Sequence, residues 1–146
     1  MAGDTFRDAV RGALDAILGA NPSITWPHKD TLNTGVKPDA ATSYFELEFP
    51  GGDEDQFTFG APGANDWKET GQITVRAVVR QNAGKTERDK AEAYIETIRN
   101  AFRGSRIPIG SRAIRIKRTG AMGGGHDEAG MWVESIALEY QRFNVG

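Results

Sequence analysis

The sequence predicts an α+β domain in which two helices pack on one face of a mainly antiparallel or mixed β-sheet of about five strands. Two stretches place apolar residues three and four positions apart, as one face of a helix does. Several other stretches alternate apolar and polar residues, as half-buried strands do. The length of 146 residues suits one hydrophobic core, so we assign residues 1–146 to a single domain.

Both predicted helices have recognisable ends. Asp4 can cap the first helix, whose apolar face covers residues 6–18 before Gly19 ends it. Thr86, followed three positions later by an acidic residue, predicts the start of a second helix that continues to about residue 103. We therefore expect two amphipathic helices that are far apart in the sequence.

The first half of the chain predicts several strands. Residues 23–26 suit a short strand, and residues 44–49 alternate cleanly, which indicates a strand with one buried and one wet face. A Pro-Gly-Gly-Asp sequence at 50–53 predicts a turn that leads into a second hairpin arm at 56–59. Residues 70–79 show the strongest strand pattern in the chain.

The second half of the chain predicts two further strands. Gly-Ser-Arg occurs at 104–106 and again at 110–112, which indicates two turns around a brief extended piece. Residues 113–118 then alternate as a strand, and a glycine-rich loop at 119–130 separates them from a last strand at 131–143.

The residue types present exclude or disfavour most catalytic chemistries. The chain has no cysteine, which excludes disulfides and thiolate chemistry. Gly84-Lys85-Thr86 resembles the end of a phosphate-binding loop, but Val79 stands where that motif requires its first glycine, so a small nucleotide-binding enzyme is a minor alternative. His126 and the two acids after it match no metal-ligand spacing. Carboxylates are abundant, but nothing singles out a catalytic pair. We predict no enzyme activity, no cofactor and no metal site.

No apolar run approaches the roughly 20 residues that cross a bilayer, so we expect no membrane partner and assembly in the cytoplasm.

Charge is segregated along the chain although the net charge is only −2. Positions 46–69 hold seven acids and one base, while positions 99–118 hold seven bases and no acid. Opposite charges on separate parts of one subunit suit a head-to-tail contact between copies, whereas an ordinary solvated surface is the open alternative. The acidic candidates for that contact are Glu46, Glu48, Asp53, Glu54 and Asp55. The basic candidates are Arg106, Arg112, Arg115, Lys117 and Arg118.

The order of these elements and several short sequence segments within them resemble the tail terminator, or tail completion, family of long-tailed phages. The resemblance covers about residues 5–142. Its carriers, besides the two helices, are Ile24-Thr25-Trp26-Pro27, the strand 44–49 followed by Pro50-Gly51, Gly71-Gln72-Ile73-Thr74-Val75, and Ile107-Pro108. His28 after the Trp-Pro pair and the long loop 119–130 depart from the family pattern.

This resemblance implies a structural role without a reaction. Such proteins form a homo-hexameric ring at the head-proximal end of the tail tube in the virion, stop tube growth and present a joining surface to neck or connector proteins. DNA passes through the lumen without sequence-specific binding. We expect the loop 119–130 to be disordered in the free protein, and its residues Gly123, Gly124, Gly125 and His126 to line the lumen or contact a partner in the ring. A neck connector or a tail tube protein is the alternative.

Overall fold

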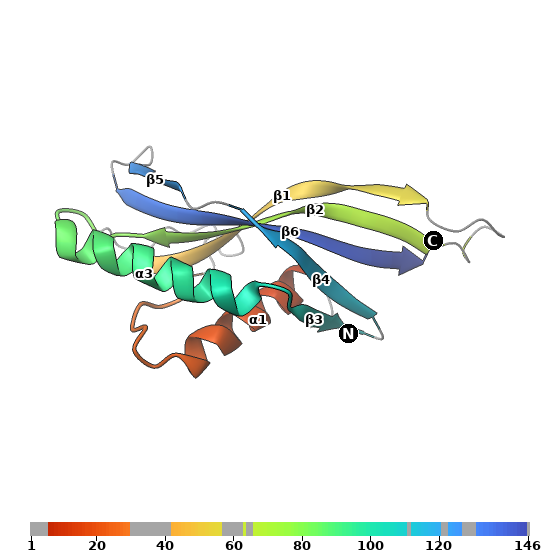
Figure 1. Cartoon of the computed structure of the whole chain (residues 1–146), viewed down its shortest axis with the longest axis horizontal. Helices are drawn as coiled ribbons and strands as arrows, with labels where there is room; N and C mark the ends of the chain where they lie inside the picture. The colour runs from red at the N-terminus through yellow and green to blue at the C-terminus, as the bar shows by residue number, and fades with distance from the viewer. Residues whose placement is uncertain are drawn as a thin grey trace.

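The computed structural model describes residues 6–29, 42–56, 63, 66–110, 112–120, 123–126 and 131–145 (Figure 1). The two helices are α1 (Phe6–Ala20) and α3 (Lys85–Phe102). The six strands are β1 (Tyr44–Gln56), β2 (Asp66–Val78), β3 (Arg106–Ile109), β4 (Arg112–Thr119), β5 (Gly123–His126) and β6 (Trp132–Val145). No helix among these residues is long and apolar enough to cross a membrane.

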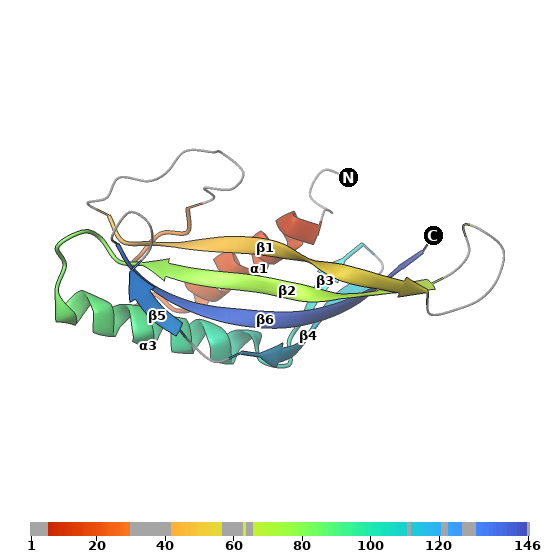
Figure 2. The same ribbon diagram turned by 90° about the horizontal axis from the view of Figure 1, so that it is seen from above.

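The six strands form one antiparallel sheet in the order β1-β2-β6-β4-β3, and β5 pairs with the first residues of β6. The sheet therefore has β1 at one edge and β3 at the other. Both helices lie on the same face of this sheet, as the view in Figure 1 shows, and Figure 2 shows the long strands β1, β2 and β6 running side by side. The predicted α+β class, with both helices on one face, is confirmed, with six strands where about five were expected.

The core lies between the helices and the sheet. Val10 and Leu14 of α1 and Ala91, Ile95, Ile98 and Phe102 of α3 are fully buried against the sheet. The strands contribute alternate residues to this core, which include Phe45, Leu47, Ile73, Val75, Ile114, Ile116, Ile136 and Leu138. The alternation that predicted half-buried strands therefore identified the side of the sheet that the helices cover.

The predicted hairpin turn at 50–53 is wrong. β1 continues through these residues, and its partner is β2, because Glu48 pairs with Thr74 while Gly51 already pairs with Gln72. Two residues of β1, at 49 and 50, thus face one residue of β2, which is a β-bulge. Gly51 has a φ of +108°, and a proline that cannot donate to the ladder fits at a bulge. Residues 57–59 of the expected second arm lie outside the described residues.

Two local predictions in the first half of the chain are also wrong. Residues 23–26 form no strand: Ile24 and Trp26 are buried in the core, and His28 alone makes an isolated bridge to Phe45. The expected wet face of the strand 44–49 begins with Tyr44, which is buried. Tyr44 packs in a small apolar cluster with Val78, Met131 and Val133.

The structure corrects the start of α3 and supports its end. Gly84, with a φ of +77°, is the N-cap of α3, and no side chain makes a capping hydrogen bond there, so Thr86 lies inside the first turn rather than at the cap. Gly104 follows the helix with a φ of +69°, and Gly110 turns the chain between β3 and β4 with a φ of +58°. The predicted cap Asp4 lies outside the described residues.

The N-terminal half of α1 is held to the sheet by aromatic and ionic contacts. The ring of Phe6 lies 4.7 Å from that of Tyr140 and 5.9 Å from that of Phe49, measured between centroids. Tyr140 Oη donates a hydrogen bond to Glu69 Oε2 over 2.5 Å, and Arg142 bonds to Glu69 Oε1 over 3.1 Å. Burial and the hydrogen bond to Glu69 raise the pKa of Tyr140. This network joins β2, β6 and α1.

Candidate subunit interfaces

The acidic candidates lie on β1, at one edge of the sheet. Glu46 and Glu48 both bind Arg76 of β2, over 2.8 Å and 3.1 Å. Asp53 and Glu54 are exposed farther along the strand, whereas the side chain of Asp55 lies outside the described residues. The structure thus places the acidic candidates along one strand and shows that Arg76 neutralises part of their charge.

Arg76 is the residue that sequence reasoning missed. It lies between two runs of like charge and belongs to neither, so counting charges along the chain did not connect it with the acids. The alternation of the strand 70–79 could have identified it. This alternation places Arg76 on the polar side of the strand, where it can face the polar side chains of the next strand.

The basic candidates lie on β3 and β4, at the opposite edge of the sheet. Arg106 of β3 stands directly across from Arg115 of β4, and both are exposed. Lys117 occupies the irregularity in the pairing of β4 with β6, and Arg118 approaches Glu139 of β6 over 3.9 Å. Arg112 begins β4 and is exposed. Like charges directly across from each other are unfavourable in a sheet, so this edge favours an acidic partner.

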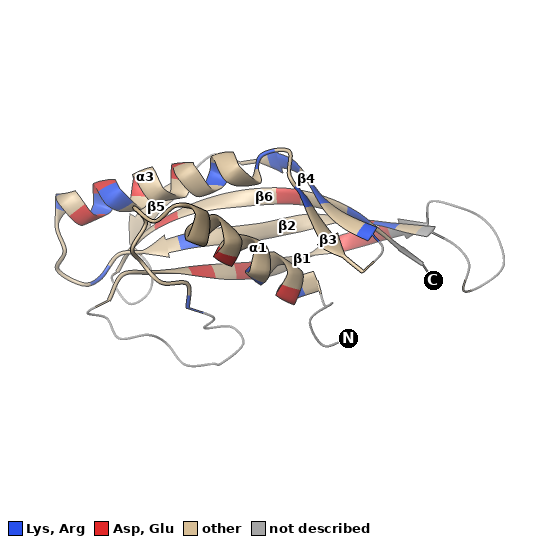
Figure 3. Ribbon diagram, turned by 90° about the horizontal axis from the view of Figure 1, so that it is seen from below, with Lys and Arg blue, Asp and Glu red and all other residues tan. Residues whose placement is uncertain are grey.

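Members of both charged sets lie on the face of the sheet that the helices do not cover, whereas Glu54, which pairs with Glu69, and Arg112, which alternates in phase with Ile114, lie on the other face. Phe45 and Leu47 of β1 and Ile114 and Ile116 of β4 belong to the core beneath the helices. Neighbouring strand residues point to opposite faces, so Glu46, Glu48 and Arg115 point away from the helices. Figure 3 shows acidic residues along β1 and basic residues along β4. We call β1 with its acids the acidic edge, and β3–β4 with their bases the basic edge.

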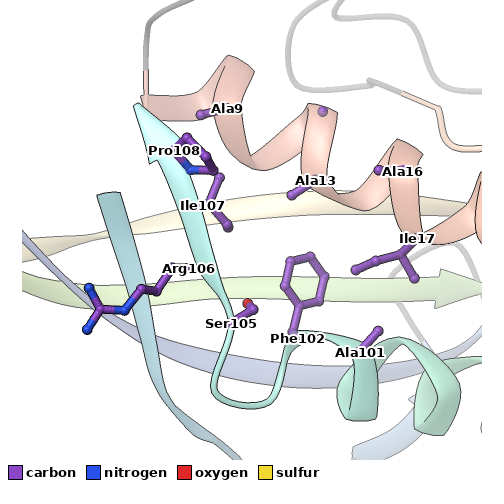
Figure 4. Close-up of a pocket in the computed structure, with 11 residues that line it drawn as sticks. Ala9, Ala13, Ala16, Ile17, Ala101, Phe102, Ser105, Arg106, Ile107 and Pro108 are labelled. Carbon is purple, nitrogen blue, oxygen red and sulfur yellow. The ribbon is translucent and has the colours of Figure 1, made fainter. Parts of the chain in front are cut away.

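An apolar groove opens beside the basic edge. It has a volume of about 440 Å³ and is lined by Ala9, Gly12, Ala13, Ala16 and Ile17 of α1, Ala101 and Phe102 of α3, and Ser105, Arg106, Ile107 and Pro108. Figure 4 shows that the small side chains of α1 face β3 across this groove. The Ser105 hydroxyl is shielded from solvent and has no hydrogen-bond partner in the part of the chain that the structure describes. On its side away from β4, β3 thus faces α1 across this groove.

The predicted loop 119–130 is partly a strand. Gly123, Gly124, Gly125 and His126 form β5, which pairs with residues 132–135 of β6. A side chain at Gly124 would place its Cβ 2.7 Å from Glu134 Oε1, so that carboxylate would have to shift. Glu134 accepts a hydrogen bond from Trp132 Nε1 over 3.0 Å, and burial raises its pKa. Residues 121, 122 and 127–130 lie outside the described residues.

The weak motifs for catalysis and metal binding gain no support from the geometry. Lys85 Nζ binds Asp89 Oδ2 over 2.7 Å, one turn along α3, and its side chain is 88% exposed. His126 is exposed, with its ring edge-on to Trp132 at 5.3 Å. The described ranges contain no group of three His, Cys, Asp or Glu residues that could hold a metal ion. The charged edges are therefore the main candidate sites.

The whole arrangement matches known proteins. A model of the family described as "Phage tail terminator protein" matches residues 5–140. This chain belongs to the phage tail terminator family. It is a structural protein of the phage tail, and the resemblance proposed from the sequence is confirmed. The family is a structural one and is not known for catalysis.

Solved structures with the same fold exist. Thirteen of their chains match, and one of these aligns over 93% of this chain and 94% of its own, with a TM-score of 0.55 and 18% sequence identity. At that identity the match shows a shared fold. No curated protein matches the sequence.

Proposed function

We propose that this tail terminator caps the head-proximal end of the phage tail tube as a homo-hexameric ring, ends tube polymerisation and offers the surface to which the head joins. Membership of the family supports the setting. The observation that carries the proposal is the placement of opposite charges at opposite edges of one sheet.

Opposite edges are what a ring of identical subunits requires. When one surface of a subunit binds a different surface of the next copy, the growing chain of subunits keeps one free surface of each kind at its ends. Assembly therefore continues until the ring closes. Exposed ion pairs contribute only about 0.2–1 kcal/mol each and weaken as salt increases. We therefore expect the free protein to be a monomer or a weak, salt-sensitive oligomer that closes into its ring on the tube.

The proposed partners follow from that position in the virion. The tail tube protein contacts one side of the ring, and neck or connector proteins contact the other. DNA passes through the lumen without sequence-specific binding, and the exposed Arg and Lys residues of the basic edge support brief contacts with its phosphates. Gly123, Gly124, Gly125 and His126 are proposed to line the lumen or to contact a partner.

Electron microscopy of a lysate from a phage that lacks this gene tests the function. We expect unjoined capsids and tails, with tubes longer than normal because nothing caps the growing end, and rescue by the wild-type gene. Tails of normal length that stay unattached would assign the protein to a connector that acts after termination. Normal tails on filled heads would contradict both roles.

Charge reversal tests the observation that carries the proposal. Changing Arg115 and Lys117 to Glu should block ring assembly and leave unjoined tails, and changing Asp53 and Asp55 to Lys in the same chain should partly restore both. A matched control reverses two exposed bases of α3 and its C-cap, Lys90 and Arg103, and should assemble normally. If no combination of reversed acids and bases restores assembly, the result would favour an ordinary solvated surface.

A further inference from the structure

We propose that neighbouring copies join edge to edge, with the outer edge of β1 in one copy added as a strand beside β3 of the next. The sheet would then continue across each subunit boundary. This inference rests on the proposed ring and names the contact that builds it. The partner is a second copy of this chain.

The outer backbone of β3 borders the apolar groove, whose opposite wall is α1 (Figure 4). Ser105 accepts a hydrogen bond from the Ile116 amide over 3.0 Å, so residues 105, 107 and 109 direct their backbone groups toward β4. Arg106 and Pro108 consequently direct theirs away from β4. These are one N–H and two C=O groups, because proline has no N–H. No described strand lies beyond β3, and Figure 4 shows the groove on that side.

Among the described residues, the outer edge of β1 has backbone hydrogen-bond partners at Phe45 alone. Phe45 directs its N–H to Pro27 O and its C=O to the Lys29 amide, both over 2.8 Å, so residue 45 faces outward from the sheet. Leu47 shares that direction by the alternation of the strand, and Gly52 does so past the bulge. Beyond Phe45 no described strand lies beside this edge. The short segment at 27–29 shows that the edge accepts an added extended chain.

The charges select one pairing of edges over the others. Two copies of β1 placed side by side would bring Glu46 and Glu48 close to their own counterparts, and two copies of β3 would do the same with Arg106. Like charges across a strand pair are unfavourable, and charges on edge strands commonly prevent such self-pairing. Pairing β1 with β3 instead brings acids to bases. The edges thus disfavour a two-fold dimer and favour a head-to-tail contact, which can close into a ring.

Cysteine cross-linking tests this contact directly, because the natural chain has no cysteine. Glu48→Cys marks the β1 edge and Arg106→Cys marks the β3 edge. We treat each single variant, an equimolar mixture of the two, and the double variant with a short bismaleimide reagent. The reactions are run on purified protein at low salt and on tails from complemented deletion phage.

The expected products differ for each sample. The double variant should give a covalent ladder that ends at the ring, the mixture should give dimers and nothing larger, and each single variant should remain monomeric. Dimers from a single variant at a yield like that of the mixture would show self-pairing and overturn the inference. Absence of the ladder from both protein and tails would overturn it as well.

The failure of this contact can be told apart from the failure of the proposed function. Wild-type complementation and measurement of tube length report on capping without any cross-link. A ladder from a protein whose loss leaves tube length unchanged would retain the edge contact and reject the capping role. Normal capping without a ladder would retain the function and reject the contact.

Discussion

The hydrogen bond from Tyr140 to Glu69 provides a quantitative test of how α1 is held to the sheet. Tyr140 is 2% exposed, and its hydroxyl bonds to a carboxylate that also binds Arg142. Tyr140→Phe removes this hydrogen bond and keeps the ring that packs on Phe6. The variant therefore isolates one polar contact between β2 and β6 beneath the first turn of α1.

The magnitude follows from the type of acceptor. A hydrogen bond to a charged group contributes about 1.5–3 kcal/mol to the free energy of unfolding. Glu69 keeps Arg142 and is 17% exposed, so water can partly replace the lost donor, and we expect a loss of about 1.5–2 kcal/mol. For a domain of this length, that corresponds to a decrease in Tm of about 4–8 °C. Urea unfolding followed by circular dichroism at pH 7 measures it.

The pH dependence gives an independent check. The folded state raises the pKa of Tyr140, so the hydroxyl stabilises the fold below the ordinary tyrosine value of about 10, and this contribution is lost as the pH rises above that value. The difference between the wild-type protein and Tyr140→Phe should therefore shrink above about pH 10.

A control in the same chain is Tyr94→Phe, which removes a longer hydrogen bond of 3.3 Å to the Ser23 carbonyl. A neutral bond of this kind contributes about 0.5–1.5 kcal/mol. Equal losses in the two variants, or a loss below about 0.5 kcal/mol for Tyr140→Phe, would refute the reasoning that the charged acceptor strengthens this contact.

Three further predictions concern single residues. Burial raises the pKa of Glu134, so ionisation of this carboxyl group costs more free energy in the folded protein than in the unfolded chain. Glu134→Gln should therefore raise Tm at pH 7, and this gain should disappear below the ordinary carboxyl pKa of about 4.3. Melting curves from pH 4 to pH 8 would show it. Gly71→Ala should lower stability by about 1–3 kcal/mol in urea, because its Cβ would lie 2.6 Å from Gly51 O and 2.7 Å from Gly52 Cα; unchanged stability would contradict the close approach at the bulge. Gly12→Ala in α1 should instead raise stability by about 0.5–1 kcal/mol, since nothing lies within 4 Å of the added Cβ; a loss there would contradict the open groove.

The sequence predicted the elements whose signals are local. The apolar stripe of α3 and the alternation of residues 70–79 depend on the period of one element against one core, and the structure confirms both, together with the strand predicted at 131–143. The glycines on either side of the extended piece at 106–109, Gly104 and Gly110, both have positive φ. Glycine tolerates this conformation, so the repeated Gly-Ser-Arg indicates two turns from local sequence alone.

The errors occurred where a partner elsewhere in the chain decides the conformation. Pro50-Gly51-Gly52 is compatible with a turn and with a bulge, and the pairing of β1 with β2 selects the bulge. The glycines at 123–125 suit a loop, yet β6 supplies a partner strand for them. Ile24 and Trp26 are buried because their side chains pack in the core, and this packing does not require their backbone to pair with a strand.

The same division applies to the candidate interfaces. The sequence by itself determined that acids and bases occupy separate segments, because composition along the chain is a local property. Only the tertiary structure decided that these segments form the two opposite edges of one sheet, and that Arg76 neutralises part of the acidic edge. Strand order results from contacts between residues far apart in the chain, and no local pattern of charge specifies which strands are left at the edges.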